Sequence, residues 1–403
     1  MPDALKPEEI EAVSVAYLAA TGRTQVEIAR ILNISQSAVS RLFKTVKDTY
    51  VRTTFCEDKV TQEDLQEIQR RTKQRALDEK LEAFAGEHGE KGPVVHSVFI
   101  HEGADRATCF EEFAKGAARV VESLLRQVQR NVGVAWGGTL WQTTLHLREV
   151  IENPWPSSDR IDFIPLCGEP LVDTEHAQAY ADRTSSRIAS ELSRIVNGEE
   201  PRPVWLGAVP AFIPRAFKKG ERKVIDRLIE LVPHYIRIFG PRDQSKPRGR
   251  PVAEDLDMIL TSAGDSEHPV GFGKGPLLQL SSEEMRDLAA RIYGDIGGVL
   301  IAKPEISKRS ASSKNLVAEL TDLWTGLKLE HLRNCADVAF SEHPNHHRRP
   351  GVTLLVFREG LADLVLEAVR QGLINHLIIG SGLEAEVEAK LDSRLGTQSR
   401  VAA

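Results

Sequence analysis

The sequence predicts two fold classes in one chain: an N-terminal all-α helix-turn-helix domain, followed by an α/β domain with a mostly parallel sheet. In residues 8–42, apolar side chains recur at helical spacing and short turns interrupt them. From residue 94 onward, short apolar runs alternate with amphipathic helical segments, which is typical of a parallel sheet covered by helices. A chain of 403 residues also exceeds one ordinary core, so we expect more than one domain.

The N-terminal pattern predicts three short helices. Residues 8–20 form the first, and residues 25–32 form the second. Thr24 is expected to cap the second helix, and Glu27 to complete a capping box with it. The motif's core is expected to contain Ile28, Ala29, Leu32, Ile34, Val39 and Leu42.

The turn before the third helix indicates what that helix does. Asn33 suits the left-handed conformation that ends a helix, and Ser35 suits the N-cap of the next one. A hairpin buried in a larger core is the alternative, but it would not need a third helix that is so polar and ends in basic residues. We therefore predict that this helix enters the DNA major groove. The candidate DNA-binding residues are Ser35, Gln36, Ser37, Ser40, Arg41 and Lys44.

Charge and composition narrow the class of protein. The formal net charge is −6, yet residues 22–52 hold six basic side chains against two acidic ones, which fits a small DNA-facing module on a larger acidic body. No apolar run is long enough for a membrane span, and the N-terminus lacks the pattern of a signal peptide, so we expect a cytoplasmic protein. The four widely spaced cysteines are interpreted as reduced, mostly buried thiols.

The larger domain is expected to alternate strands and helices. Strands are expected in residues 94–100, 131–136, 161–167, 203–212, 255–264, 352–357 and 374–380. Helices are expected in residues 107–128, 137–147, 174–196, 224–232, 281–294 and 361–372. The resulting division is a DNA-binding domain in 1–55, a connector helix and linker in 56–92, and an effector-binding and oligomerisation domain in 93–403. Within the connector, residues 60–84 read as one helix, and residues 85–93 break the chain.

The segment VGVAWGGTL holds the most informative motif of the larger domain. A strand that ends at Gly137-Gly138 and runs into a helix at Thr139 presents backbone N–H groups and a positive helix end to a ligand. A tight connection without a ligand is an equally good interpretation of these three residues alone. Small residues in TSAGDSEHP also end a strand, at the edge where open α/β sheets bind ligands.

Two further motifs have competing interpretations. In YGDIGG, Asp295 stands between glycines, where its carboxylate either accepts hydrogen bonds from sugar hydroxyls or structures its own turn. In SEHPNHHRRP, His343, His346 and His347 are a weak zinc pattern because of the adjacent arginines and prolines, and we interpret this segment as a solvated basic loop. We expect neither a metal nor a cofactor.

These motifs, in this order behind this helix-turn-helix, resemble the SorC/DeoR-type sugar-binding transcriptional regulators of bacteria. The resemblance rests on VGVAWGGTL, YGDIGG and EAVRQGLINHLI and covers nearly the whole chain. It implies an effector domain related in fold to sugar-phosphate isomerases of the glucosamine-6-phosphate deaminase type, without their activity. It also implies a homodimer or homotetramer that regulates an operon. Gly137, Gly138 and Thr139 would be effector contacts, and Asp295 a polar contact to the sugar.

One segment departs from the family pattern. The family has a double glycine before its last helix and a lysine three residues on, which helps to hold the effector's phosphate. Here VFREGLAD has Phe357-Arg358 in place of the glycines and Leu361 in place of the lysine. Either Arg358 supplies the missing charge, or the ligand is not a phosphosugar.

The sequence therefore predicts a ligand-responsive bacterial transcriptional regulator of a carbohydrate or polyol catabolism operon, and not an enzyme. Its expected partners are operator DNA and a sugar, polyol or sugar-phosphate effector, with no membrane. One alternative is a constitutive DNA-binding protein whose large domain only oligomerises. Another is an isomerase- or deaminase-type enzyme, for which the sequence shows no convergent acid and base.

Overall fold

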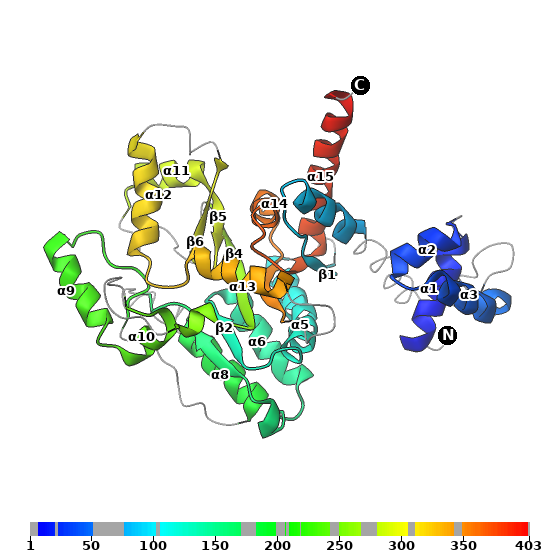
Figure 1. The fold of residues 1–403 in the computed structure, drawn as a ribbon, viewed down its shortest axis with the longest axis horizontal. Coiled ribbons are helices and arrows are strands. Elements are labelled where there is room, and N and C mark those ends of the chain that lie inside the picture. Colours follow the sequence, from blue (N-terminus) through cyan, green and yellow to red (C-terminus); the bar gives the residue numbers. More distant parts are fainter. Residues whose placement is uncertain are drawn as a thin grey trace. The chain divides into compact units, whose positions relative to one another are not determined.

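The protein is described by a computed structural model that separates into two compact units, residues 1–81 and residues 82–403 (Figure 1). The structure describes residues 7–20, 23–50, 76–101, 105–170, 183–198, 206, 209–217, 219–241, 250–266, 280–304, 311–341 and 349–401. Each unit is built around its own buried side chains, so each is described by itself.

The first unit is the helix-turn-helix. Its helices are α1 (Pro7–Ala20), α2 (Gln25–Leu32) and α3 (Gln36–Tyr50). The predicted capping box is present: Glu27 N donates to Thr24 Oγ1 over 3.3 Å, and Thr24 N donates to the Glu27 carboxylate over 2.7 Å. Asn33 has φ 54°, the left-handed conformation expected of it. The second predicted helix and both of its ends are therefore confirmed.

The core of this unit forms where the three helices meet. Val15, Leu18, Ile28 and Val39 are buried there. The other predicted core residues, together with some neighbours, pack against these four while partly exposed: Tyr17, Ala19, Ala29, Ile31, Leu32, Ile34, Leu42 and Phe43. The predicted apolar spacing thus gives the unit a core of its own, small but continuous across all three helices.

The second unit is an α/β domain whose sheet has the strand order β1-β8-β7-β4-β2-β3, with every neighbouring pair in that order parallel. The hairpin β5–β6 continues from β4 with antiparallel pairing. The strands are β1 (Val94–Val98), β2 (Asn131–Val134), β3 (Asp162–Pro165), β4 (Met258–Asp265), β5 (Ile292–Ile296), β6 (Val299–Ala302), β7 (Gly351–Val356) and β8 (His376–Gly380). This confirms the predicted fold class.

The helices of this unit are α5 (Arg106–Leu125), α6 (Gly138–Val150), α8 (Ser185–Asn197), α9 (Lys219–Ile229), α10 (Pro233–Phe239), α11 (Ser282–Arg291), α12 (Ala311–Leu323), α13 (Leu329–Ser341), α14 (Ala362–Arg370) and α15 (Ser381–Val401). Of these, α5, α6, α8, α13 and α15 pack against the parallel strands, and α11 and α12 pack against the hairpin β5–β6. Side chains of α5, α6 and α8 share one apolar cluster with β2 and β4. All six residues of β7 are buried, so both faces of the sheet are covered there.

Three predicted elements differ in the structure. The helix predicted for 174–196 begins at Ser185, with Thr184 as its N-cap, and residues 174–182 lie outside the described residues. Residues 203–212 do not form a strand in their described part, where Pro210 and Phe212 make only isolated bridges. The helix predicted for 281–294 ends at Arg291, and the chain continues as β5. Gly294 explains this change, because a Cβ there would lie 2.2 Å from the Gly264 carbonyl oxygen, so only glycine lets β5 approach β4 so closely.

The connector is described in part. Residues 76–86 are helical, and the rest of the predicted connector helix, residues 60–75, lies outside the described residues. Helices α10, α12, α13 and α15 were not predicted from the sequence. Among the described residues, none of the helices has the length and apolarity needed to cross a membrane.

Candidate functional site

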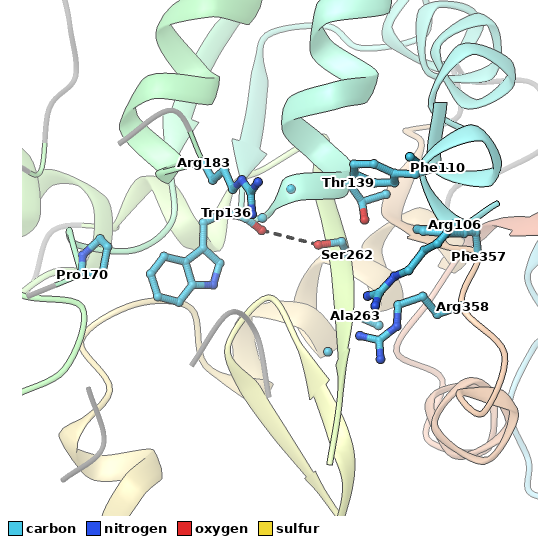
Figure 2. A pocket seen from close by; sticks show the side chains of 14 residues that line it. Arg106, Phe110, Trp136, Thr139, Pro170, Arg183, Ser262, Ala263, Phe357 and Arg358 are labelled. Atoms are coloured by element: carbon cyan, nitrogen blue, oxygen red, sulfur yellow. Dashed lines mark hydrogen bonds between the residues drawn. The ribbon is translucent and has the colours of Figure 1, made fainter. Parts of the chain in front are cut away.

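A pocket of about 700 Å³ opens at the carboxyl edge of the parallel strands (Figure 2). Its walls come from the residues that follow β2 and β7, from the last part of β4 and from the start of α5. Pro170, after β3, and Arg183, just before α8, complete the described lining. Carboxyl edges of open parallel sheets are where such folds bind ligands, because the loops that diverge there leave a crevice. The predicted strand end TSAGDSEHP contributes Ser262, Ala263 and Gly264 to the wall.

The glycine turn between β2 and α6 forms one side of the pocket. Gly137 is the N-cap of α6 with φ 133°, and a Cβ at this position would lie 2.8 Å from Ser262 Oγ. No described side chain caps this end of α6, so its first N–H groups and the Thr139 hydroxyl stand at the cavity. A 13-residue helix with a free N-terminus favours a negatively charged ligand group. The structure thus brings Gly137, Gly138 and Thr139 together at the pocket.

Three arginines line the same pocket, and none of the lining residues that the structure describes is acidic. The Arg183 guanidinium lies 3.7 Å from where a Cβ of Gly138 would stand, beside the glycine turn. Figure 2 shows Arg106 and Arg358 across Ser262 from Arg183. Among the described residues, Arg106 and Arg183 have no carboxylate partner, whereas Arg358 forms an ion pair with Asp265 at the end of β4. The described part of the lining therefore carries a net positive charge.

Helix α5 contributes the Arg106 side chain to the pocket, but not the free amide groups of its N-terminus. The Asp105 carboxylate accepts hydrogen bonds from Ala107 N and Thr108 N, both over 2.9 Å. These bonds lower the pKa of Asp105 below its ordinary value, so it stays ionised. The first amides of α5 are thus occupied, and an anion at this side of the pocket would meet the Arg106 guanidinium instead.

Aromatic side chains form the wall next to Arg106. Phe357 stacks on Phe110 with ring centroids 5.4 Å apart and an interplanar angle of 28°. Phe357 also stacks on Phe113, at 5.1 Å and 27°. Leu361 is only 2% exposed, at the start of α14. The segment VFREGLAD therefore gives this pocket an aromatic wall and an arginine, and position 361 is part of the core.

Asp295 stands apart from the lining residues. It lies in β5, paired with Gly264, and its side chain is 0% exposed. Its Oδ2 accepts a hydrogen bond of 2.9 Å from Gly298 N. The carboxylate thus organises the β5–β6 turn, and no part of its surface is open to a ligand. The sequence left two interpretations of Asp295 open, a contact to a sugar or a role in its own turn. The hydrogen bond to Gly298 N corresponds to the second.

The sequence reasoning missed Arg106 and Arg183. Each precedes or begins a helix at the carboxyl edge of the sheet, but neither belongs to a local motif that singles it out. Ser262 was predictable from the sequence, since it lies in the last part of the strand predicted for residues 255–264. Glu169, one residue before the pocket residue Pro170, was also missed, and burial raises the pKa of this carboxyl.

The face of α3 that was predicted to meet DNA is exposed. All six candidate residues, Ser35, Gln36, Ser37, Ser40, Arg41 and Lys44, lie on the surface of the first unit. Ser35 caps α3, accepting a 3.1 Å hydrogen bond from Ala38 N, and its hydroxyl lies 2.9 Å from that of Ser37. These serines therefore hold the start of the helix as well as facing outward.

The remaining predicted features concern thiols and metals. Cys167 and Cys335 are free and buried, and burial raises the pKa of Cys335 to about 12, so both are protonated thiols. Among the described residues, no three histidine, cysteine or acidic side chains gather as metal ligands would. The histidines at 343, 346 and 347 lie outside the described residues.

Solved structures of transcriptional regulators resemble this chain. A transcriptional regulator from Streptococcus pneumoniae TIGR4 is 17% identical, with a TM-score of 0.51, over 78% of this chain and 98% of its own. The full-length sorbitol operon regulator SorC from Klebsiella pneumoniae is 17% identical, with a TM-score of 0.49, over 96% of this chain and 100% of its own. A DeoR family transcriptional regulator from Listeria monocytogenes is 16% identical, with a TM-score of 0.49, over 78% and 99%.

The likeness to the Streptococcus regulator shows a shared fold. At this level of identity, function has to be argued from the site. No protein-family model matches the sequence, and no curated protein matches it either.

Proposed function

We propose that this protein is a ligand-responsive bacterial transcriptional regulator of a carbohydrate or polyol catabolism operon. The observation that carries the proposal is the union of two features in one chain. A helix-turn-helix unit exposes a polar recognition helix, and an α/β unit holds a cationic pocket at the carboxyl edge of its sheet. The fold shared with a known transcriptional regulator supports it.

The DNA-binding role belongs to α3. Helices of this motif place their first turns against base edges in the major groove. Gln36 and Ser40 bring groups that can donate to and accept from bases, while Arg41 and Lys44 can reach guanine or phosphate. Two half-sites one helical turn apart, about 34–36 Å, require two such helices. We therefore propose that the protein works as a homodimer or homotetramer in the cytoplasm.

The effector role belongs to the pocket. The free end of α6 and the guanidinium groups of Arg106 and Arg183 suit an anionic group such as a phosphate, and the Thr139 and Ser262 hydroxyls suit the hydroxyls of a sugar or polyol. A sugar phosphate or polyol phosphate satisfies both parts. The aromatic pair Phe110–Phe357 offers an apolar surface to the ligand's carbon skeleton.

The test is fluorescence anisotropy with the whole protein and labelled DNA from upstream of its own operon, at fixed salt, because affinity for DNA depends steeply on salt. The titration is repeated with a panel of sugars, polyols and their phosphates. We expect competitor-resistant binding that one phosphorylated compound shifts. Specific binding that nothing shifts would instead indicate a constitutive DNA-binding protein, and absence of specific binding would contradict the proposal.

A further inference from the structure

We propose that α15 relays the occupancy of the pocket to Phe84, which belongs to the second unit and lies in the helical segment of residues 76–86 that leads back along the chain toward the first unit. The proposal concerns how binding in the pocket affects residues outside it. It rests on the proposed function only in assuming that this binding regulates the DNA-binding unit. The contacts on which it depends all lie within the second unit. They run from Arg358 in the pocket to Phe84.

The relay begins at the loop of residues 357–360, which follows β7. Phe357 and Arg358 line the pocket, and the ion pair between Arg358 and Asp265 ties this loop to the end of β4. An anionic ligand would compete with the Asp265 carboxylate for the Arg358 guanidinium, because both are acceptors for the same N–H groups. Ligand binding thus bears directly on the position of the loop.

The same loop is packed against the start of α15. At Gly380 an added Cβ would lie 2.9 Å from Phe357 Cβ, so the end of β8 approaches the loop as closely as only glycine permits. Gly360 N donates a 2.6 Å hydrogen bond to Glu386 Oε2, in the second turn of α15. The loop therefore cannot shift without straining or breaking a charge-assisted bond to this helix.

Ion pairs continue this attachment along α15. Lys390 Nζ lies 2.7 Å from Asp363 Oδ2, and Arg394 reaches the same carboxylate at 3.9 Å. Asp363 stands in the first turn of α14, directly after the loop. The inner face of α15 is buried, with Leu383, Val387 and Leu391 at most 1% exposed. The helix is consequently held as a rigid piece that moves together with the loop and α14.

The far end of this attachment is Phe84. The Arg394 guanidinium lies over the Phe84 ring, 5.4 Å from its centroid, and Phe84 is 8% exposed. Positions 380 and 394 are separated by 14 residues, or roughly 21 Å of helix at about 1.5 Å per residue. Figure 1 shows α15 running away from the strands toward the C-terminus. It thus spans from the rim of the pocket to Phe84.

The test is hydrogen exchange on the whole protein without DNA or effector, followed in peptides that cover residues 76–86. Arg358→Gln removes the ion pair to Asp265. We expect it to raise exchange in the loop, in the first turns of α15 and, by about threefold or more, in residues 76–86, because each loses part of what holds it closed. Arg183→Gln is the matched control, since it removes a pocket arginine that faces the glycine turn instead of the loop.

Two further variants remove the contacts at either end of α15, from Glu386 to the loop and from Arg394 to Phe84. Glu386→Ala should abolish the effect of Arg358→Gln on residues 76–86 in the double variant, and Arg394→Ala should raise exchange there while leaving the loop unchanged. Circular dichroism and thermal melting establish that each variant is folded. If Arg358→Gln changes the loop alone, or if Arg183→Gln affects residues 76–86 equally, the relay is wrong. Because neither DNA nor effector is present, this outcome is independent of the anisotropy experiment.

Discussion

At the scale of single residues, charge and backbone freedom decide what each unit can bind. Arg106 and Arg183 give the pocket cations that no described carboxylate neutralises, and Gly137 leaves the space that Ser262 occupies. In the first unit, Arg41 stands exposed on α3, next to positions that hold the start of the helix. The arginine side chains can be changed without disturbing a core, whereas a side chain at Gly137 would meet Ser262.

Arg41→Ala should weaken specific operator binding by roughly 1–3 kcal/mol if Arg41 contacts a base. The measurement is anisotropy against operator and scrambled DNA over a range of salt. Arg30→Ala is the control, because Arg30 is an equally exposed cation on α2, and its loss should lower affinity for both DNAs alike. Unchanged operator affinity would remove Arg41 from the reading surface.

Thr139→Val should leave DNA binding intact and weaken the response to the effector by about tenfold, which corresponds to roughly 1.4 kcal/mol for a lost hydrogen bond. Thr143→Val is the same substitution one turn further along α6, at a buried position away from the pocket. A full response in Thr139→Val would show that the glycine turn is only structural.

His376 should make stability depend on pH. Burial and the neighbouring His96, whose Nε2 lies 3.0 Å from His376 Nδ1, lower the pKa of His376 to about 3. Between about pH 6.5 and that value the unfolded chain binds a proton that the folded chain does not, so stability falls as pH falls. The contribution is up to about 1.4 kcal/mol per pH unit.

The measurement for His376 is urea unfolding at several pH values from about 7 down to about 5. His376→Asn should flatten the dependence of the unfolding free energy on pH, whatever it does to stability at pH 7. An identical slope in wild type and variant would contradict this origin of the pH dependence.

At the scale of elements, helix ends place the functional side chains. The capping box at Thr24 starts α2, and the left-handed Asn33 ends it, which sets the direction in which α3 leaves the turn. In the second unit a helix start without a cap is important. Helix α6 begins at a glycine and has no described side-chain cap, so its first amide groups are available to a ligand. Capped ends thus build the helix-turn-helix, and an uncapped end builds one side of the pocket.

Asn33→Val should destabilise the first unit by about 1–2 kcal/mol, because a β-branched side chain is disfavoured at φ 54°. Asn33→Gly keeps the left-handed conformation accessible and should be close to wild type. Hydrogen exchange of α2 and α3 measures the difference. Equal protection in both variants would show that the turn tolerates another conformation.

At the scale of the whole molecule, the two units have separate cores, and the pocket lies wholly within the second. A ligand that binds only the folded second unit stabilises that unit by about 2.7 kcal/mol at a hundred times its dissociation constant. The effector found by anisotropy should therefore raise the melting temperature of the second unit. No described residue of α1–α3 lines the pocket, so the exchange protection of these helices in the absence of DNA should not rise by the same amount.

Calorimetry combined with hydrogen exchange of α1–α3 checks this prediction. Equal stabilisation of both units by the effector would mean that they unfold as one. No stabilisation of either would mean that the compound acts on the DNA complex without entering the pocket.

The sequence by itself determined the elements whose signals are local. Capping residues, apolar spacing and the left-handed Asn33 predicted the helix-turn-helix, because each acts over one or two turns of chain. The alternation of strands and helices predicted the parallel sheet, and with it the edge where Gly137, Gly138 and Thr139 lie. Arg358 was predicted as a possible substitute for a missing charge, and the structure places it in the pocket.

Only the tertiary structure decided which distant residues meet. Arg106, Arg183 and Arg358 are far apart in the chain, and they meet at one pocket because β1, β7 and the segment before α8 all end at the same edge of the sheet. The YGDIGG motif predicted Asp295 as a contact to the ligand. In the structure, the pairing of β5 with β4 buries Asp295, and its carboxylate bonds within the β5–β6 turn. Strand order and burial arise from contacts between distant segments, and no local pattern records them.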